Sequence, residues 1–383
     1  MSAPSNAVIA REALQEWLDV LVAQGYRTIG PKLRDRAIVY DDVTHVSDFP
    51  AGWNDRQDAG HYEIQHRDDD AWFGFNVGPH SWKRFLHPPL ERLWTAHRRD
   101  DGFEVRPADP SGLKQAFFGV RACELHAIAI QDRVFFGGRY SDDAYRARRL
   151  SSLMVAVNCT QGGGTCFCHS MGTGPKATLG FDLSLTELLG SDQATFLVEV
   201  GTDAGARLLD AVPHRAASGA ELAAAQAMLA RASAQMGRSL DTTRLPELLR
   251  EVPGHPRWDD LAARCLSCGN CTMVCPTCFC TSVEDHTRLD GTAAERLRVW
   301  DSCFTLDFSY LHGGSVRHSA RARYRHWMTH KLSHWFDQFG GSGCVGCGRC
   351  ITWCPAGIDI TAEAAALRVA PPAHNEPGAH ART

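Results

Sequence analysis

Two stretches of this sequence carry four cysteines each at the same spacing. Both follow the pattern C-x2-C-x2-C-x3-C-P, the first ending at Pro276 and the second at Pro355. Such runs are typical of cubane 4Fe-4S clusters, and in two-cluster chains the fourth cysteine of each run usually ligates the other cluster. The sequence therefore predicts two 4Fe-4S clusters. The expected ligand sets are Cys265, Cys268, Cys271 and Cys354 for the first cluster, and Cys344, Cys347, Cys350 and Cys275 for the second.

Zinc is the alternative metal for a cysteine-rich motif. Structural zinc sites typically use C-x2-C pairs that lie far apart in the sequence. Here a complete four-cysteine run occurs twice with identical spacing and a following proline. The repetition favours iron-sulfur clusters over zinc.

Four further cysteines lie around two expected strands, at 115–120 and 153–158. Two of the four come directly after these strands, and two lie on the glycine-rich loop that follows the second strand. If the strands are parallel neighbours, the thiols meet at the carboxyl edge of the sheet, where α/β folds bind ligands. A third 4Fe-4S cluster is the first interpretation, and small buried hydrophobic side chains are the alternative. The four residues are Cys123, Cys159, Cys166 and Cys168.

Three cysteines and three histidines near the runs have simpler interpretations. Cys278, Cys280 and Cys303 lie close to a predicted cluster, which favours packing around it over ligation. Three histidines recur at every fourth position of an expected helix, a spacing more typical of a solvated helix face than of a metal site. They are His326, His330 and His334.

The composition limits which cellular compartment and which kinds of binding partner are expected. The chain has 383 residues and fifteen cysteines, an odd number in a chain too long to need disulfides, so a reducing compartment is expected. The first residues form no export signal, and no apolar run is long enough to span a membrane. The net charge of -4 provides no basic surface for nucleic acid. We expect a cytoplasmic protein with protein partners, and neither membrane nor nucleic acid among them.

The first part of the chain, residues 1–215, is expected to be an α/β domain. Strand and helix patterns alternate there, which implies a sheet that is at least partly parallel. The expected strands are 37–40, 62–65, 71–77, 115–120, 153–158 and 195–200, and the expected helices are 11–24, 124–134 and 184–189.

The second part is expected to be helical. Ser218 and Glu221 form a capping-box pattern before a helix at 219–236, within a linker at 216–256. The dicluster domain is expected at 257–365. Its two cysteine runs are separated by an insert with helical spacing at 326–336. Residues 366–383 are expected to form a disordered tail.

Three sequence blocks resemble the beta subunit of cytosolic sulfhydrogenases, which are NAD(P)-linked nickel-iron hydrogenases. They also resemble the electron-transfer subunit of anaerobic sulfite reductase. The resemblance covers about residues 116–362, and the second half is also similar to the α-helical ferredoxin module of heterodisulfide reductase and succinate dehydrogenase, which implies an all-α dicluster domain. The blocks are Phe118 to Ile128, Asn158 to Pro175, and Cys275 to Cys280.

The resemblance implies an electron-transfer subunit with no catalytic residues of its own. Its partners would be the hydrogenase small and large subunits and a flavin- and NAD(P)-binding subunit. The sequence agrees, since it lacks a dinucleotide fingerprint, a P-loop and a nucleophile elbow. Two alternatives stay open: the electron-transfer subunit of an anaerobic sulfite reductase, and a flavin-bearing subunit like the beta subunit of coenzyme F420-reducing hydrogenase.

Overall fold

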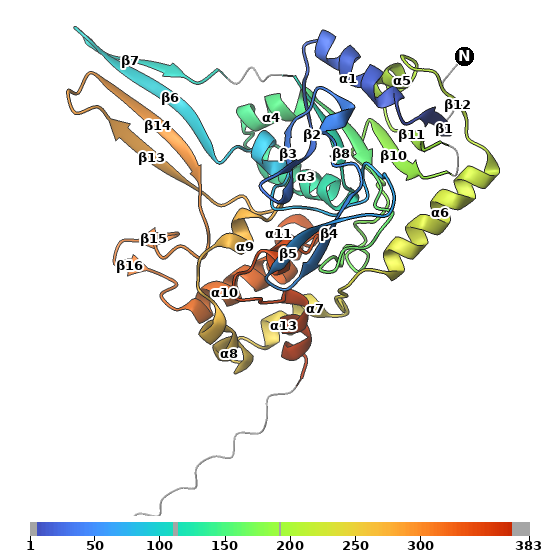
Figure 1. Ribbon diagram of the computed structural model, residues 1–383. Helices are drawn as coiled ribbons and strands as arrows, with labels where there is room; N and C mark the ends of the chain where they lie inside the picture. The colour runs from blue at the N-terminus through green and yellow to red at the C-terminus, as the bar shows by residue number, and fades with distance from the viewer. Residues whose placement is uncertain (1–5, 110–113, 191–192, 370–383) are drawn as a thin grey trace, which may run out of the picture.

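A mixed eight-stranded sheet organises the first half of the chain (Figure 1). The computed structural model describes residues 6–109, 114–190 and 193–369. The strand order is β12-β1-β11-β10-β9-β8-β2-β3, with β2, β8, β9 and β10 parallel. The strands are β1 (Asn6–Ala10), β2 (Arg27–Arg34), β3 (Ala37–Asp42), β8 (Gln115–Val120), β9 (Ser152–Val157), β10 (Leu183–Leu188), β11 (Thr195–Val200) and β12 (Arg215–Ala216).

Helices cover both faces of this sheet. Leu14 and Trp17 belong to the core on one face, and Leu125 and Tyr145 to the core on the other. The first face carries α1 (Ala13–Ala23) and α5 (Asp203–Leu209), and the second carries α2 (Lys83–Leu86), α3 (Ala122–Phe135) and α4 (Asp143–Leu150). The expected α/β architecture is therefore present in the first half of the chain.

The second half is mainly helical and has its own core, which includes Trp258, Leu261, Trp327 and Met328. Helix α6 (Gly219–Ala234) leads into it along the outside of the molecule (Figure 1) and begins with the expected capping box at Ser218. The other helices are α7 (Leu245–Glu251), α8 (Arg257–Arg264), α9 (Asn270–Met273), α10 (Ala320–Thr329), the π-helical turn η2 (His330–His334), α11 (Trp335–Phe339), α12 (Arg349–Thr352) and α13 (Ile360–Leu367).

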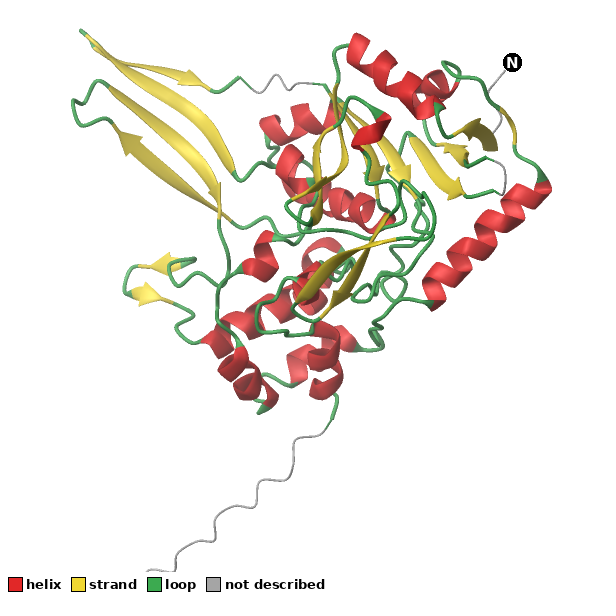
Figure 2. Cartoon of the chain, in the orientation of Figure 1, coloured by secondary structure: helices red, strands yellow, loops and turns green. Residues whose placement is uncertain are grey.

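The expectation of an all-α second domain is wrong for the insert between the cysteine runs. The insert contributes two strands to a four-stranded sheet that projects from the body, in the order β13-β14-β6-β7 (Figure 2). The other two strands of this sheet come from the first half of the chain, so the sequence of the insert alone does not indicate the sheet. The strands are β6 (Leu90–Arg99), β7 (Gly102–Pro107), β13 (Thr281–Thr287) and β14 (Ala293–Trp300), and a small hairpin follows with β15 (Tyr310–Leu311) and β16 (Gly314–Ser315).

The hairpin of β4 (Trp53–Asp58) and β5 (His61–His66) makes a second contact between the two halves of the chain. The amide of Gly60 at its turn donates to the carbonyl of Ile351 in α12 at 3.1 Å, and Tyr62 packs against Trp353. A short 3-10 helix, η1 (Val46–Asp48), lies before this hairpin in the chain. The hairpin therefore covers part of the second cysteine run.

Two sequence-based expectations within the first half are wrong. Residues 71–77 are buried but irregular, because side chains replace a neighbouring strand as hydrogen-bond partners. Glu187 accepts the amides of Trp72 and Phe73 at 2.7 and 2.9 Å, and Arg121 donates to the carbonyl of Phe73 at 2.9 Å. Backbone groups that are hydrogen-bonded to side chains in this way do not need a neighbouring strand as a partner.

The expected helix at 184–189 is instead strand β10. It lies between β9 and β11 and is buried on both faces, since Ser184 and Thr186 are as inaccessible as Leu183 and Leu185. A strand buried on both sides shows no clean alternation of apolar and polar residues. Its sequence pattern was therefore ambiguous between a short helix and a strand.

The remaining expected elements are present, with small shifts of their ends. Strands β8 and β11 occupy the expected residues, and the segment 326–336 is helical through α10, η2 and α11. The expected start of the disordered tail at residue 366 is too early, because Leu367 still belongs to α13 and is buried. The part of the expected tail from residue 370 on lies outside the described residues. No helix in the described ranges is long and apolar enough to cross a membrane.

Candidate metal centres

The first set of cysteines lines a cavity that opens toward the surface. Cys265, Cys268 and Cys271, from the loop after α8 and from α9, meet Cys354 there. Cys268 is exposed, as is its neighbour Leu266. The rest of the lining is mostly apolar and aromatic, with Phe304, Tyr324, Trp327, Ile358 and Ile360. We call this the outer site.

The second set lines an interior cavity next to the first. It combines Cys344, Cys347 and Cys350 with Cys275, and we call it the inner site. Cys350 lines both cavities, so the two sites lie side by side. In each site, three cysteines of one run therefore meet the fourth cysteine of the other run.

The two runs fold alike locally. Gly269 and Gly348 each precede a short helix, α9 and α12, and have φ values of 73° and 75°. Glycine adopts this left-handed conformation without the steric penalty that a Cβ atom brings. The backbone of each run thereby turns sharply between its second and third cysteine, so that the thiols of that run face a common cavity.

A buried lysine enters the inner site from the turn η2. The Nζ of Lys331 lies 3.2 Å from the Sγ of Cys275, 2.8 Å from the hydroxyl of Thr277 and 3.4 Å from the carbonyl of Gly343. Burial alone would lower the pKa of Lys331, but the negative charge of neighbouring cysteine thiolates, above all Cys275, outweighs it and raises that pKa well above its usual range. The spacing of the cysteines carries no signal for this contact, because Lys331 lies between the two runs.

The inner site also shifts the acidity of its fourth cysteine. A hydrogen bond from the thiol of Cys278 lowers the pKa of Cys275 well below its ordinary value; burial opposes this shift, and the ammonium of Lys331 supports it. Metals bind the thiolate form of cysteine. The lowered pKa therefore favours the thiolate form of Cys275, with Cys278 as a hydrogen-bond donor beside it.

The third set of cysteines gathers at the carboxyl edge of the sheet. β8 and β9 are parallel neighbours, as the interpretation required, and Cys123 and Cys159 follow them directly. Burial raises the pKa of all four thiols, and neighbouring thiols of the set raise it further for Cys123, Cys166 and Cys168. The four cysteines therefore lie in one neighbourhood, in which Cys159 is partly exposed and the other three are buried. No three His, Cys, Asp or Glu side chains in the described ranges are placed to hold a single metal ion.

The loop that carries Cys166 and Cys168 packs directly on the second cysteine run. The amide of Phe167 donates to the carbonyl of Gly346 at 2.8 Å, and the hydroxyl of Thr173 donates to the carbonyl of Val345 at 2.6 Å. The third set is therefore adjacent to the inner site. Together the three sets form a series that runs from the surface, through the inner site, to the edge of the sheet.

The remaining cysteines lie beside these sets. Cys280 and Cys303 form a pair in which a hydrogen bond from Cys303 lowers the pKa of Cys280 to about 7. Of the three histidines expected on a solvated helix face, His334 is exposed, whereas His326 and His330 are partly buried with stacked rings. Burial lowers the pKa of both to about 4.

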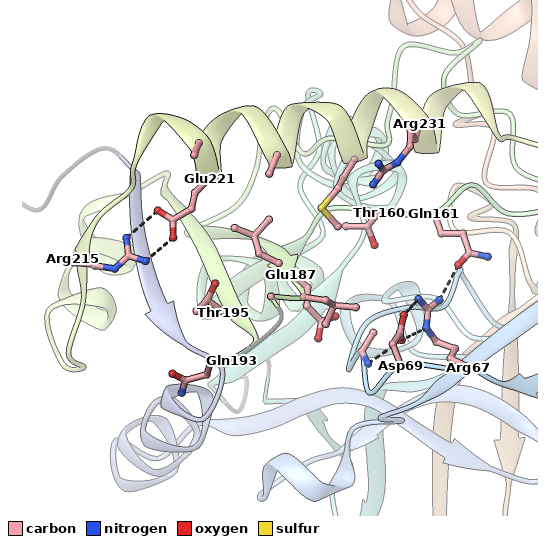
Figure 3. A pocket seen from close by; sticks show the side chains of 17 residues that line it. Arg67, Asp69, Thr160, Gln161, Glu187, Gln193, Thr195, Arg215, Glu221 and Arg231 are labelled. Carbon is pink, nitrogen blue, oxygen red and sulfur yellow. Dashed lines mark hydrogen bonds and ion pairs between the residues drawn. The ribbon is translucent and has the colours of Figure 1, made fainter.

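A large open cavity of about 780 Å³ lies between α6 and the edge of the sheet (Figure 3). It is close to the third set, because Thr160 and Gln161 of its lining follow Cys159 in the chain. Most of its charged side chains are already paired with each other. Arg67 pairs with Asp69, and Arg215 pairs with Glu221.

The cysteine sets define an iron-sulfur protein, and comparison with known proteins agrees. The family model for the 4Fe-4S dicluster domain matches residues 264–358, which include both runs. The chain is 33% identical over 285 residues to the Sulfhydrogenase 2 subunit beta of Pyrococcus furiosus, covering 72% of this chain and 79% of that relative. It therefore belongs to the family of sulfhydrogenase beta subunits. No solved structure matches the chain.

Proposed function

We propose that this chain is the electron-transfer subunit of an NAD(P)-linked nickel-iron hydrogenase complex. The observation that carries the proposal is the series of three adjacent cysteine sets, which begins at the surface and ends at the sheet edge. A cubane cluster exchanges one electron at a time. Adjacent clusters in such a series would pass electrons through the subunit.

The donor groups fit this assignment. The outer and inner sites would each hold one 4Fe-4S cluster on four thiols around a cavity, and the third set would hold one more. The buried ammonium of Lys331 supports an anionic group in the inner site, because an isolated buried charge is costly. The division into an α/β domain at 1–215, a linker at 216–256 and a dicluster domain at 257–365 is part of the same proposal.

The partners follow from the two ends of the series. We infer that hydrogenase small and large subunits exchange electrons with one end, and that a flavin- and NAD(P)-binding subunit does so with the other. The relative's name, a sulfhydrogenase subunit, supports a hydrogenase complex. The exposed Cys268 and Leu266 mark the outer site as one place where a partner cluster can come close.

The test is purification of the native complex through a tag on this chain. The complex should contain nickel, and H2 should bleach the iron-sulfur absorption of this subunit, which NAD(P)+ should then restore. The variant Cys350→Ser should assemble but lose this response, because Cys350 lines both cavities. A sirohaem partner would identify a sulfite reductase instead. Resolved flavin bands in the isolated chain would identify a flavin subunit.

A further inference from the structure

The inner site contains a positive charge that no carboxylate balances in the described part of the chain. Lys331 is 5% exposed, and its Nζ contacts one thiol, one hydroxyl and one carbonyl. Within the described ranges, no ion pair joins Lys331 to an Asp or Glu, and its Nζ contacts only the three partners just named. A second buried ammonium nearby, that of Lys83, donates to the carbonyl of Met273 and lies over the ring of Trp300 rather than against a ligand sulfur. The buried Arg349 differs again, because it is paired with Glu124 at 2.7 Å.

The outer site has no comparable charge among its described lining residues. The lining of its cavity consists of cysteines, aromatic and aliphatic side chains, one proline and one glycine. Among these side chains, the phenol of Tyr324 and the indole N–H of Trp327 are the polar groups besides the thiols, and neither carries a charge. The two sites therefore share a cysteine pattern and differ in electrostatics, since the ammonium of Lys331 is part of the inner lining and the outer lining contains no ammonium.

This difference affects the two oxidation states of a cluster unequally. A 4Fe-4S cluster with four thiolate ligands is anionic, and reduction adds one more negative charge. Net charge and hydrogen bonds to sulfur are among the factors that set its reduction potential. An ammonium held against a ligand sulfur in the protein interior stabilises the more negative state, because screening by water is weak there.

Resting on the proposed function, we propose that Lys331 is a positioning residue that raises the reduction potential of the inner cluster through its contact with the Sγ of Cys275. Electrons would then be held preferentially at the centre that adjoins both the outer site and the third set. Lys331 lies in a π-helical turn, a local irregularity that frequently marks functional sites.

The test is a redox titration of the full-length, cluster-containing chain, followed by electron paramagnetic resonance. In Lys331→Met, one midpoint potential should fall, so that the reduced-to-oxidised ratio at a fixed potential drops at least tenfold, which is about 59 mV for one electron. The other midpoints should not move. Lys331→Arg keeps the charge and should stay near the wild type. Lys176→Met removes an exposed lysine paired with Glu199 and controls for net charge.

The iron content separates the possible failures. Wild-type protein that binds no iron contradicts the proposed function itself. Full iron content in Lys331→Met with unchanged midpoints contradicts only the role of Lys331. If Lys331→Met loses iron, Lys331→Gln keeps a hydrogen-bond donor without the charge; a lowered midpoint in that variant supports the inference. Loss of the inner cluster from both variants would show that the ammonium holds the cluster rather than sets its potential, and would overturn the inference.

Discussion

The guanidinium of Arg349 lies 2.7 Å from the carboxylate of Glu124, and neither side chain is accessible to solvent. Arg349 lies between Cys347 and Cys350 of the inner site, whereas Glu124 directly follows Cys123 of the third set. The other oxygen of Glu124 accepts a hydrogen bond from Tyr40 at 2.6 Å. This buried ion pair therefore joins the dicluster region to the sheet at the point where two cysteine sets meet.

Removal of one partner should be strongly destabilising, because it leaves the other charge buried and unpaired. We expect Glu124→Ala to lower the free energy of unfolding by about 3–5 kcal/mol, measured by anaerobic denaturation. The matched control is Asp337→Ala, which breaks the exposed pair with Arg250 and should cost about 0–1 kcal/mol. Equal losses in the two variants would show that the Arg349 pair does not stabilise the junction.

The same junction depends on a close backbone approach at Gly346. A Cβ atom there would lie 2.6 Å from the carbonyl oxygen of Phe167, whereas a Cβ atom at Gly340 would meet nothing within 4 Å. Both glycines have positive φ, so substitution by alanine costs each about 1–2 kcal/mol in backbone strain. We expect Gly346→Ala to lose about 1–3 kcal/mol more than Gly340→Ala, from overpacking. Similar denaturation midpoints would rule out a tight contact.

The cysteine patterns and the sheet could be anticipated because their signals are local. The spacing of each run indicated which cysteines line a common cavity, and the alternating strand and helix patterns indicated a partly parallel sheet, in which β8 and β9 are parallel neighbours. Two of the missed features depend on contacts between distant segments. Lys331 reaches Cys275 across 56 positions, and β14 pairs with β6, which comes from the other half of the chain.

Local pattern also misleads where side chains replace backbone partners. The segment 71–77 has the composition of a strand, but Glu187 and Arg121 satisfy its backbone groups. β10 has the composition of a short helix, but it is buried between two strands. In both cases tertiary contacts decide the structure, and these contacts cannot be read from a window of a few residues.

Acid should destabilise the protein through His87. This side chain is fully buried, and burial, with Arg298 and Lys83 nearby, lowers its pKa from 6.5 to about 3. Between these values the unfolded chain binds a proton that the native state does not, so stability is complete above pH 6.5 and is lost as the pH falls toward 3. The loss at pH 5 should be about 2 kcal/mol.

The variant His87→Phe keeps a ring against Phe135 but cannot titrate. Its free energy of unfolding should therefore fall by about 2 kcal/mol less than that of the wild type between pH 7 and pH 5. The control is His286→Gln, which removes an exposed histidine from β13 and leaves His87 in place. A pH profile of His87→Phe parallel to the wild type would show that His87 does not resist protonation in the native state.

The crossed ligand sets predict opposite results for two similar substitutions. Cys275→Ser should impair the inner cluster, although Cys275 belongs to the first run, and Cys354→Ser should impair the outer cluster. Each variant should lose up to about four irons, the content of one cubane. Redox titration then distinguishes them, because only the cluster that remains in Cys354→Ser should respond to Lys331→Met. The crossover would be contradicted if Cys275→Ser lost the outer cluster and Cys354→Ser lost the inner cluster.

The third set predicts a difference between two equally buried cysteines. Cys123 and Cys303 are both 5% exposed, but only Cys123 shares its neighbourhood with Cys159, Cys166 and Cys168. If the set holds a cubane, Cys123→Ala should lower the iron content of the full-length chain by about four irons, whereas Cys303→Ala should leave it unchanged.

If the four cysteines are only small hydrophobic side chains, both variants should lose a similar amount of stability and no iron. Anaerobic reconstitution with iron analysis and denaturation of the same samples therefore separates ligation from packing. A wild-type content of about twelve irons would agree with three cubanes, and about eight would leave only the outer and inner clusters. In that second case the electron path would end at the inner site, and a partner subunit would have to approach Cys344 or Cys347 instead of the sheet edge.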